Sequence, residues 1–504
     1  MEDFDLDRNA CYAAIKTRDR RFDGHFYIGV VSTGVYCRPI CPARTPKLEN
    51  CVFLPSAAAA HQTGFRPCLR CRPEVAPGLA GWRGSINTVS RALHLIAEGA
   101  LDETGVEDLA SRVGVGDRHL RRLFDQHVGA SPVSVAQTHR ILFAKGLITE
   151  TSLPMAQIAL AAGFGSIRRF NDVFQRTYGR PPRALRRASG GDVDRSGAIT
   201  LKLPFSPPYD WDGILRFLAG RAIPDVEMVE EESYRRSFAF HNAQGAVEVT
   251  QATGESFLRA TIRTTDVRVL PTVVARLRRL FDLDADIAAI DSHLSQDPRL
   301  AKLVRIRPGV RVPGAWDDFE LAVRALLGQQ ISVPAARTLA GRIAAGFGLP
   351  YTAAIVNGHR LPNLVFPSPE AVAGADLAAI GLTTARSRAL QALSAAMAAD
   401  PYLLRTCETL DETVAKLQAL PGVGPWTAQY IAMRALREPD AFPASDLGLL
   451  RAMENGAGRP TPKELLQAAE PWRPWRAYAA VRLWTQADGA PSAKRPAKAQ
   501  AHHA

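Results

Sequence analysis

Two stretches of the chain have apolar residues at helical spacing on both sides of a central glycine. Residues 106–124 surround Gly114, and residues 158–174 surround Gly163. Each pattern predicts two helices joined by a tight turn, with basic residues clustered on the second helix. Gly179 and the prolines that follow it predict the end of the second pair. The pattern therefore predicts an all-α unit with two helix-turn-helix motifs in tandem.

A third helical pattern covers residues 417–430. It predicts a helix, a tight glycine turn and a second helix, with Pro425 in the first turn, where its missing N–H costs little. Exposed backbone N–H groups in such a turn favour phosphate, so Gly422 and Gly424 are candidate nucleic-acid contacts. The pattern of glycines alone favours an ordinary turn between helices.

Breaks in the periodic pattern divide the chain. They fall at Pro77-Gly78, within residues 81–84, within residues 188–191 and at Arg307 to Gly309. We predict four folded units and a tail, which cover residues 1–80, 84–188, 198–303, 304–488 and 489–504. The tail lacks periodicity and is predicted to be disordered and basic.

Composition supports a modular globular protein that binds a polyanion. Of 504 residues, 46% are hydrophobic and 22% are charged, which excludes wholesale disorder. Sixty-two Lys and Arg against fifty Asp and Glu give a net charge of +12, with most of the excess in the first 190 residues. A basic surface attracts nucleic acid first. No apolar run approaches the roughly 20 residues that span a bilayer, and Met1 to Asp7 is acidic, so we expect no membrane partner and a cytoplasmic location.

Six of the seven cysteines lie in the first 71 residues. This placement favours a metal site over a disulfide framework in a reducing compartment. Cys37 and Cys41 form one close pair, and Cys68 and Cys71 form another, a ligand set for one tetrahedral Zn²⁺. Spacing alone favours a structural site. The remaining cysteines are predicted to be small core residues (Cys11, Cys51) and an inert buried thiol (Cys407).

The residues around these cysteines, 26–42 and 64–73, resemble the amino-terminal domain of the Ada family of adaptive-response regulators. The resemblance covers residues 1–80 and implies a small zinc-bound α/β domain. It also implies that Cys37, one of the four zinc ligands, accepts a methyl group from a DNA methylphosphotriester. Four thiolates on one zinc dication carry a net charge of about −2, and methylation of Cys37 removes one negative charge. Repulsion of DNA then falls, so repair acts as a one-way switch.

Residues 84–188, and above all 162–174 with Gly179 to Pro182, resemble the AraC-type DNA-binding domain of transcription activators. The resemblance implies binding to promoter DNA and contact with RNA polymerase. The residues expected to contact bases and phosphates lie on the two second helices. They are Asp117, Arg118, Arg121, Arg122, Ser166, Arg168, Arg169 and Asn171. A Pro-Cys-His-Arg motif of a second methyltransferase is absent, so reversal of guanine-O6 methylation is not predicted.

Residues 417–430 resemble the helix-hairpin-helix DNA glycosylases, and residues 208–211, 322–332 and 472–484 extend the similarity to 3-methyladenine DNA glycosylase II over 198–488. The resemblance implies an antiparallel α+β domain, then an all-α catalytic domain that hydrolyses the N-glycosidic bond of N-alkylated purines. Asp446 is the predicted catalytic carboxylate. Asp440 is the alternative and is more typical of a capping or bridging residue.

An aromatic pocket for the flipped base is implied by the same resemblance. Trp426, Tyr430 and Trp484 match its walls, which attract a cationic base. Trp472 and Trp475 fit either the pocket or the core. Gln330 occupies a wedge position where relatives carry leucine. A tryptophan at 426 replaces the lysine of bifunctional relatives, so strand cleavage is not expected. The family also implies a monovalent cation at the hairpin carbonyls near Gln418, Leu420 and Val423.

Together these features predict a multidomain, mainly α protein with α+β parts. It would sense alkylated DNA through Cys37, activate transcription and excise N-alkylated purines. The partners are double-stranded DNA and RNA polymerase. Two alternatives stay open: a regulator whose glycosylase part only binds DNA, and a repair enzyme whose zinc-bound front half only tethers it.

Overall fold

A computed structural model describes residues 7–76, 87–186 and 198–488, apart from short gaps at 231, 241–242, 252–253, 353–354, 357–358, 406–408 and 457. Cys407, the tail after residue 488 and the breaks at 77–84 and 188–191 lie outside the described residues. Among the described residues, no helix has both the length and the apolar character to cross a membrane.

The amino-terminal domain is a four-stranded sheet with a helix at its start and another before its last strand. Three strands pair in antiparallel fashion in the order β3-β1-β2, and the short β4 joins β2 in parallel. Gly34, with φ +63°, makes the tight turn between β1 and β2. The elements are α1 (Arg8–Thr17), β1 (Tyr27–Val30), β2 (Val35–Cys37), β3 (Cys51–Leu54), α2 (Ala57–Gln62) and β4 (Arg66–Pro67).

The second domain contains the two predicted helix-turn-helix motifs. Gly114 and Gly163 have φ values of +81° and +75°, so a left-handed residue reverses the chain in each turn. In α6 the residues Leu120 and Phe124 are fully buried while the arginines between them face solvent. The elements are α3 (Asn87–Ala97), α4 (Ala100–Glu103), α5 (Val106–Arg112), α6 (Asp117–His127), α7 (Pro132–Glu150), α8 (Met155–Ala161), α9 (Ile167–Tyr178) and α10 (Pro182–Leu185).

The third unit is a five-stranded, fully antiparallel sheet in the order β5-β9-β8-β7-β6. In β5, buried and exposed residues alternate, as expected when one face packs on a core. The elements are β5 (Ile199–Pro204), α11 (Trp211–Ala219), β6 (Glu227–Glu230), β7 (Ser233–Phe240), β8 (Ala243–Gln251), β9 (Phe257–Thr264) and α12 (Leu270–Leu280). This is the predicted antiparallel α+β domain.

The remaining helices form the carboxyl-terminal domain. They are α13 (Ile287–Leu294), α14 (Pro298–Ile306), α15 (Asp318–Leu327), α16 (Val333–Phe347), α17 (Pro369–Ala373), α18 (Thr384–Ala399), α19 (Leu410–Gln418), α20 (Pro425–Arg434), α21 (Leu447–Ala452), α22 (Pro462–Ala468) and α23 (Arg476–Asp488). The predicted boundary at 303/304 falls inside α14, whose side chains share a core with α23.

The expectation of an all-α carboxyl-terminal unit is wrong in one detail. Four two-residue strands follow α16 and form two short antiparallel pairs. They are β10 (Leu349–Pro350), β11 (Ile355–Val356), β12 (His359–Arg360) and β13 (Leu364–Val365). Segments this short carry no alternating pattern from which a strand can be predicted.

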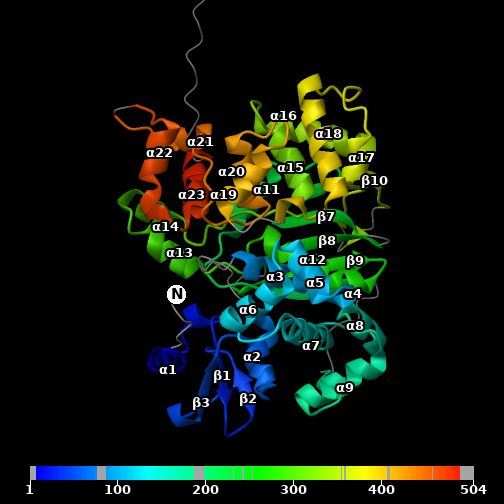
Figure 1. Cartoon of the computed structure of the whole chain (residues 1–504), viewed down its shortest axis with the longest axis vertical. Helices are drawn as coiled ribbons and strands as arrows, with labels where there is room; N and C mark the ends of the chain where they lie inside the picture. The colour runs from blue at the N-terminus through cyan, green and yellow to red at the C-terminus, as the bar shows by residue number, and fades with distance from the viewer. Residues whose placement is uncertain are drawn as a thin grey trace, which may run out of the picture.

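The five-stranded sheet occupies the middle of the molecule. Figure 1 shows α1, β1–β3 and α9 at one end of the long axis and α16, α18, α20 and α21 at the other end. The Glu150 carboxylate joins three domains, because it accepts from Arg72 Nη2 at 2.6 Å and from the backbone N–H of Lys202 at 3.1 Å. The amino-terminal and carboxyl-terminal halves are therefore packed together.

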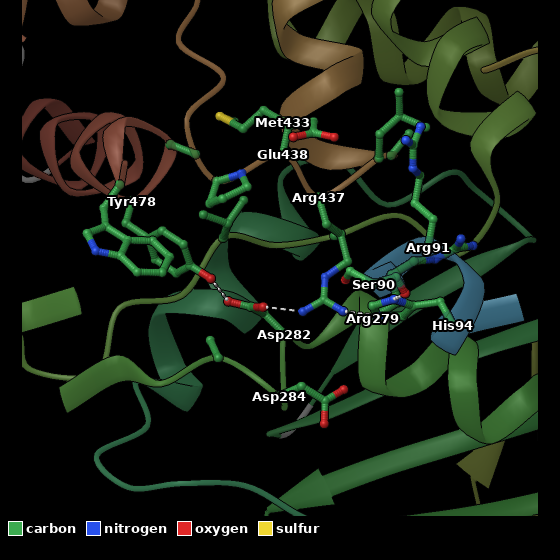
Figure 2. A pocket seen from close by; sticks show the side chains of 18 of the residues that line it. Ser90, Arg91, His94, Arg279, Asp282, Asp284, Met433, Arg437, Glu438 and Tyr478 are labelled. Atoms are coloured by element: carbon green, nitrogen blue, oxygen red, sulfur yellow. Dashed lines mark hydrogen bonds and ion pairs between the residues drawn. The ribbon is translucent and has the colours of Figure 1, made fainter. Parts of the chain in front are cut away.

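A second junction surrounds a cavity of about 110 Å³ between α3 and the carboxyl-terminal domain (Figure 2). Arg437 donates to Asp282 Oδ1 at 2.9 Å and lies 2.8 Å from His94 Nε2, and the Tyr478 hydroxyl donates to Asp282 Oδ2 at 2.9 Å. His94 Nδ1 lies 2.7 Å from the Ser90 carbonyl, so it carries the ring proton and Nε2 accepts from Arg437. Burial and the Arg437 charge lower the pKa of His94 to about 4, which keeps this neutral form. We call the side chains of His94, Asp282, Arg437 and Tyr478 the junction latch.

Candidate functional sites

The cysteine cluster is assembled by the parallel pairing of β2 and β4. Cys37 ends β2 and Cys68 directly follows β4, and the register pairs Tyr36 with Pro67. Cys41 and Cys71 follow in the next turns, and all four sulfurs lie within 4.8 Å of one another. Cys68 and Cys71 are buried, whereas Cys37 and Cys41 are partly exposed. The predicted four ligands therefore come together in one small volume.

The surroundings of the cluster suit thiolate ligands of one zinc ion. The backbone N–H groups of Arg38 and Arg70 donate to the sulfurs of Cys71 and Cys68 at 3.3 and 3.4 Å, as expected for sulfurs that carry negative charge. The buried Arg38 side chain donates to Asp23 at 2.7 Å and to the Cys71 carbonyl at 3.1 Å. Sequence reasoning missed this contact, because Arg38 stands between two cysteines without being a ligand and Asp23 lies 15 positions away.

Cys11 and Cys51 lie apart from the cluster in the apolar core of the same domain. They are 5% and 1% exposed, and burial raises the pKa of Cys11 to about 11. The prediction that they are core residues is confirmed.

Asp446 lies between two tryptophans. It is the N-cap of α21, where Oδ1 accepts from the backbone N–H of Leu449 at 3.0 Å. Trp426 Nε1 donates to Oδ2 and Trp484 Nε1 donates to Oδ1, each at 2.9 Å. The carboxylate, partly exposed, is thus fixed by neutral donors from α20, α21 and α23.

The three predicted pocket residues are adjacent. The Tyr430 ring stacks on Trp426 with centroids 5.1 Å apart and an angle of 13° between the planes, and it lies 6.3 Å from Trp484. We call Asp446 with these three aromatic side chains the excision cluster. Trp472 and Trp475 are 2% and 4% exposed, so both are core residues.

Asp440 has a different environment. Arg476 Nε donates to its Oδ1 at 2.7 Å, and Arg473 forms a second ion pair with it. Two guanidinium groups neutralise this carboxylate. The geometry therefore agrees with a bridging Asp440 and leaves Asp446 as the candidate catalyst.

The hairpin between α19 and α20 lies against the loop that follows α15. Gln329 Nε2 donates to the Gly422 carbonyl and to Thr427 Oγ1, both at 2.8 Å. The neighbouring Gln330 is exposed and has a left-handed backbone, φ +58°. Sequence reasoning selected Gln330 and missed Gln329. The one signal for Gln329 was its position next to Gln330, and that signal does not show which of the two glutamines contacts the hairpin. Gly424 caps α20 at its predicted start, Pro425.

Comparisons with known proteins agree with this layout. Four family descriptions match in order: "Metal binding domain of Ada" over residues 10–74, "Helix-turn-helix domain" over 109–188, "AlkA N-terminal domain" over 200–317 and "HhH-GPD superfamily base excision DNA repair protein" over 323–474. A Mycobacterium tuberculosis protein named "Probable bifunctional transcriptional activator/DNA repair enzyme AlkA" is 43% identical over 95% of this chain and 96% of its own length. The chain belongs to this family.

Two further relatives match the carboxyl-terminal half of this chain. "DNA-3-methyladenine glycosylase 2" of Escherichia coli is 33% identical over 56% of this chain and 95% of its own length. The solved 3-methyladenine DNA glycosylase from Archaeoglobus fulgidus is 21% identical, with a TM-score of 0.50, and covers 57% of this chain and 98% of its own. At that identity the solved structure supports the glycosylase fold alone. The predicted fold class is confirmed apart from the four short strands after α16, and the four-cysteine zinc site of the Ada-type domain is confirmed.

The predicted DNA-reading residues of the helix-turn-helix domain are on the surface. Arg118, Arg121 and Arg122 are exposed on α6, and Arg168, Arg169 and Asn171 are exposed on α9. Ser166 differs from them, because its hydroxyl accepts from the backbone N–H of Arg169 at 3.2 Å and so caps α9. Asp117 lies 3.6 Å from Arg121, at the start of α6.

Proposed function

We propose that this protein is an alkylation-damage response protein with two chemistries, base excision by the carboxyl-terminal half and methyl acceptance by the amino-terminal half. The observation that carries the first is the Asp446 carboxylate held by Trp426 and Trp484. An anionic group beside aromatic faces suits a cationic N-alkylpurine and the positive sugar that remains when this base leaves.

In the proposed excision, the flipped base enters beside the rings of Trp426 and Tyr430. The N-glycosidic bond breaks, and its electron pair leaves with the base, which becomes neutral. Asp446 stabilises the oxocarbenium-like sugar. Water then adds to the anomeric carbon and loses a proton, which leaves an abasic site. A cationic leaving group needs no general acid, so the expected substrates are N-alkylated purines such as 3-methyladenine.

The second chemistry is assigned to Cys37. Cys37, Cys41, Cys68 and Cys71 would hold a zinc ion, which would keep their sulfurs as thiolates at neutral pH. The partly exposed Cys37 sulfur attacks the methyl carbon of a methylphosphotriester, the carbon–oxygen bond breaks, and its electron pair stays on the phosphate as a diester anion. Cys37 becomes a thioether, and the centre loses one negative charge. DNA affinity of the helix-turn-helix domain then rises, because repulsion of the phosphates falls.

Other parts of the proposal concern binding. The exposed arginines of α6 and α9 read promoter DNA, and the activated protein contacts RNA polymerase. Gly422 and Gly424 place backbone N–H groups of the hairpin against a DNA phosphate, with Gln330 as the wedge. Carbonyl oxygens near Gln418, Leu420 and Val423 would hold a monovalent cation, as the family resemblance implies.

The test uses the full chain and duplex DNA treated with a methylating agent. Chromatography measures released bases, and mass spectrometry of the Cys37 peptide measures methyl transfer. We expect both 3-methyladenine and a methylated Cys37 peptide. Released base without a modified peptide would leave a repair enzyme with a structural zinc, whereas a modified peptide without released base would leave a regulator with a DNA-binding module.

Matched variants assign the two chemistries to their residues. Asp446→Asn keeps the N-cap and should abolish base release. Asp297→Asn is its control, because Asp297 also caps a helix and accepts from a tryptophan, Trp472, at 3.0 Å, away from the excision cluster. Cys37→Ser should lose methyl acceptance, with the core variant Cys51→Ser as its control. Equal activity of Asp446→Asn and Asp297→Asn would overturn the assignment.

A further inference from the structure

Arg434 is a buried cation directly behind the excision cluster. It lies on α20 one turn after Tyr430 and is 3% exposed. Its Nη1 donates to the Tyr430 hydroxyl oxygen at 2.7 Å. Nε donates to the Pro313 carbonyl at 2.7 Å, and Nη2 donates to the Gly314 carbonyl at 2.9 Å. One guanidinium group thus fastens the Tyr430 side chain to the segment that precedes α15.

The charged groups around Arg434 favour negative character on the Tyr430 oxygen. The charged side chains that act on it from neighbouring elements are Arg221 and Arg324, both cationic. Arg324 has its own acidic partners in Glu227 and Glu320. The guanidinium carbons of Arg221 and Arg434 both lie over the Phe217 ring, at 3.7 and 4.7 Å from its centroid. A phenol oxygen with negative character is therefore a favourable partner for Arg434 in this buried position.

Tyr430 is in turn the central ring of the cluster. It contacts both tryptophans that donate to Asp446, and it is parallel to Trp426 within 13°. A hydrogen bond to the phenol oxygen does not stop the ring from turning about its Cβ–Cγ bond, because the oxygen lies on that axis. It does oppose rotation about the Cα–Cβ bond, which would swing the whole ring away from Trp426. The position of the Tyr430 ring therefore depends on the hydrogen bond at its hydroxyl oxygen.

We infer that Arg434 is a positioning residue for base excision: it holds the Tyr430 oxygen and so keeps the ring in place against Trp426, where the two rings receive a cationic base. This inference rests on the proposed glycosylase function, since it names how that site is kept in order. Arg434 itself stays behind Tyr430 and contacts the segment at 313–314 rather than the carboxylate.

The ionisation of Tyr430 provides a readout that is independent of activity. Burial alone would raise its pKa, but the charges of Arg434 and Arg221 and the Arg434 hydrogen bond lower it overall. Burial instead raises the pKa of the other buried tyrosines, among them Tyr27, Tyr209 and Tyr234. An absorbance titration of tyrosinate should show one early-ionising tyrosine. That signal should disappear in Tyr430→Phe and move to higher pH in Arg434→Met.

Excision kinetics provide the second readout. Arg434→Met keeps an unbranched side chain but removes the guanidinium group, and we expect it to raise KM for an N-alkylpurine duplex about tenfold, the usual cost of one charge-assisted hydrogen bond. Arg434→Lys should recover part of the loss. Tyr430→Phe keeps the ring, so the double variant should be no worse than Arg434→Met alone. Arg342→Met is the matched control, because its guanidinium makes a single exposed bond to the Ile380 carbonyl.

The outcomes separate the two proposals. A wild-type protein that releases no base refutes the proposed function, while the titration still decides whether Arg434 holds Tyr430. An unchanged titration in Arg434→Met, or kinetic losses that add fully in the double variant, would overturn the role of Arg434. If Arg434→Met does not fold, Tyr430→Phe and Arg434→Lys carry both readouts.

Discussion

The junction latch makes a quantitative prediction about how the two halves are held together. In Arg437→Ala, Asp282 loses its ion pair while it stays buried, with its side chain 3% exposed. Removal of one partner from such a pair costs several kcal/mol, because the remaining charge stays buried without a counter-charge. Asp282 keeps the Tyr478 hydroxyl as a donor, so we expect about 3 kcal/mol, at the lower end of that range.

Hydrogen exchange with mass spectrometry measures this loss locally. A cost of about 3 kcal/mol corresponds to roughly a hundredfold faster exchange where the junction opens before the whole protein unfolds. The acceleration should be confined to α3 and to residues 435–440. Arg459→Ala is the control, because its pair with Glu454 is exposed on both sides and contributes at most about 1 kcal/mol. Equal exchange in wild type and Arg437→Ala would refute the latch.

The pH dependence of the Arg437→Ala defect tests whether the unpaired charge of Asp282 causes it. Burial raises the pKa of Asp282 even with Arg437 present, and the loss of Arg437 must raise it further. A carboxyl with a raised folded-state pKa contributes stability below its unfolded pKa and loses it as the pH rises through the folded pKa. The defect of Arg437→Ala should therefore shrink on acidification. Asp282→Asn in the same background should remove that pH dependence, since no charge is then stranded.

Three further outcomes follow from the other sites. Zinc removal by a chelator should unfold the amino-terminal domain, seen as loss of its exchange protection, with excision activity retained. Gln330→Leu should raise the excision rate several-fold in single-turnover assays, because an apolar wedge fills the vacated base stack better; no change would show that Gln330 is not the wedge. Gly422→Ala should weaken DNA binding, because φ at this position is +78° and the new Cβ would lie 2.6 Å from the Ala389 Cβ. A duplex affinity equal to that of the wild type would contradict this prediction.

Local patterns were sufficient to predict much of the fold. The turns at Gly114 and Gly163, the start of α20 at Pro425 and the four cysteine ligands depend on short-range chemistry that the residues themselves display. The arrangement of domains was not predictable in this way. His94 and Arg437 are 343 positions apart, and Gln329 meets Gly422 across 93 positions. A single side chain in such a contact leaves no periodic signal, because only the assembled fold brings it to its partner.

The choice between Asp440 and Asp446 shows what the structure adds to a motif. Both are aspartates after the same hairpin, and spacing alone does not separate them. The two guanidinium groups on Asp440 make it a structural ion pair, with little negative charge left for a reacting sugar. Asp446 is held instead by two indole N–H groups and one backbone N–H, which orient the carboxylate and carry no net charge. Neutral donors fix its position and leave its charge available to a cationic transition state, which is the combination that glycosidic bond cleavage requires.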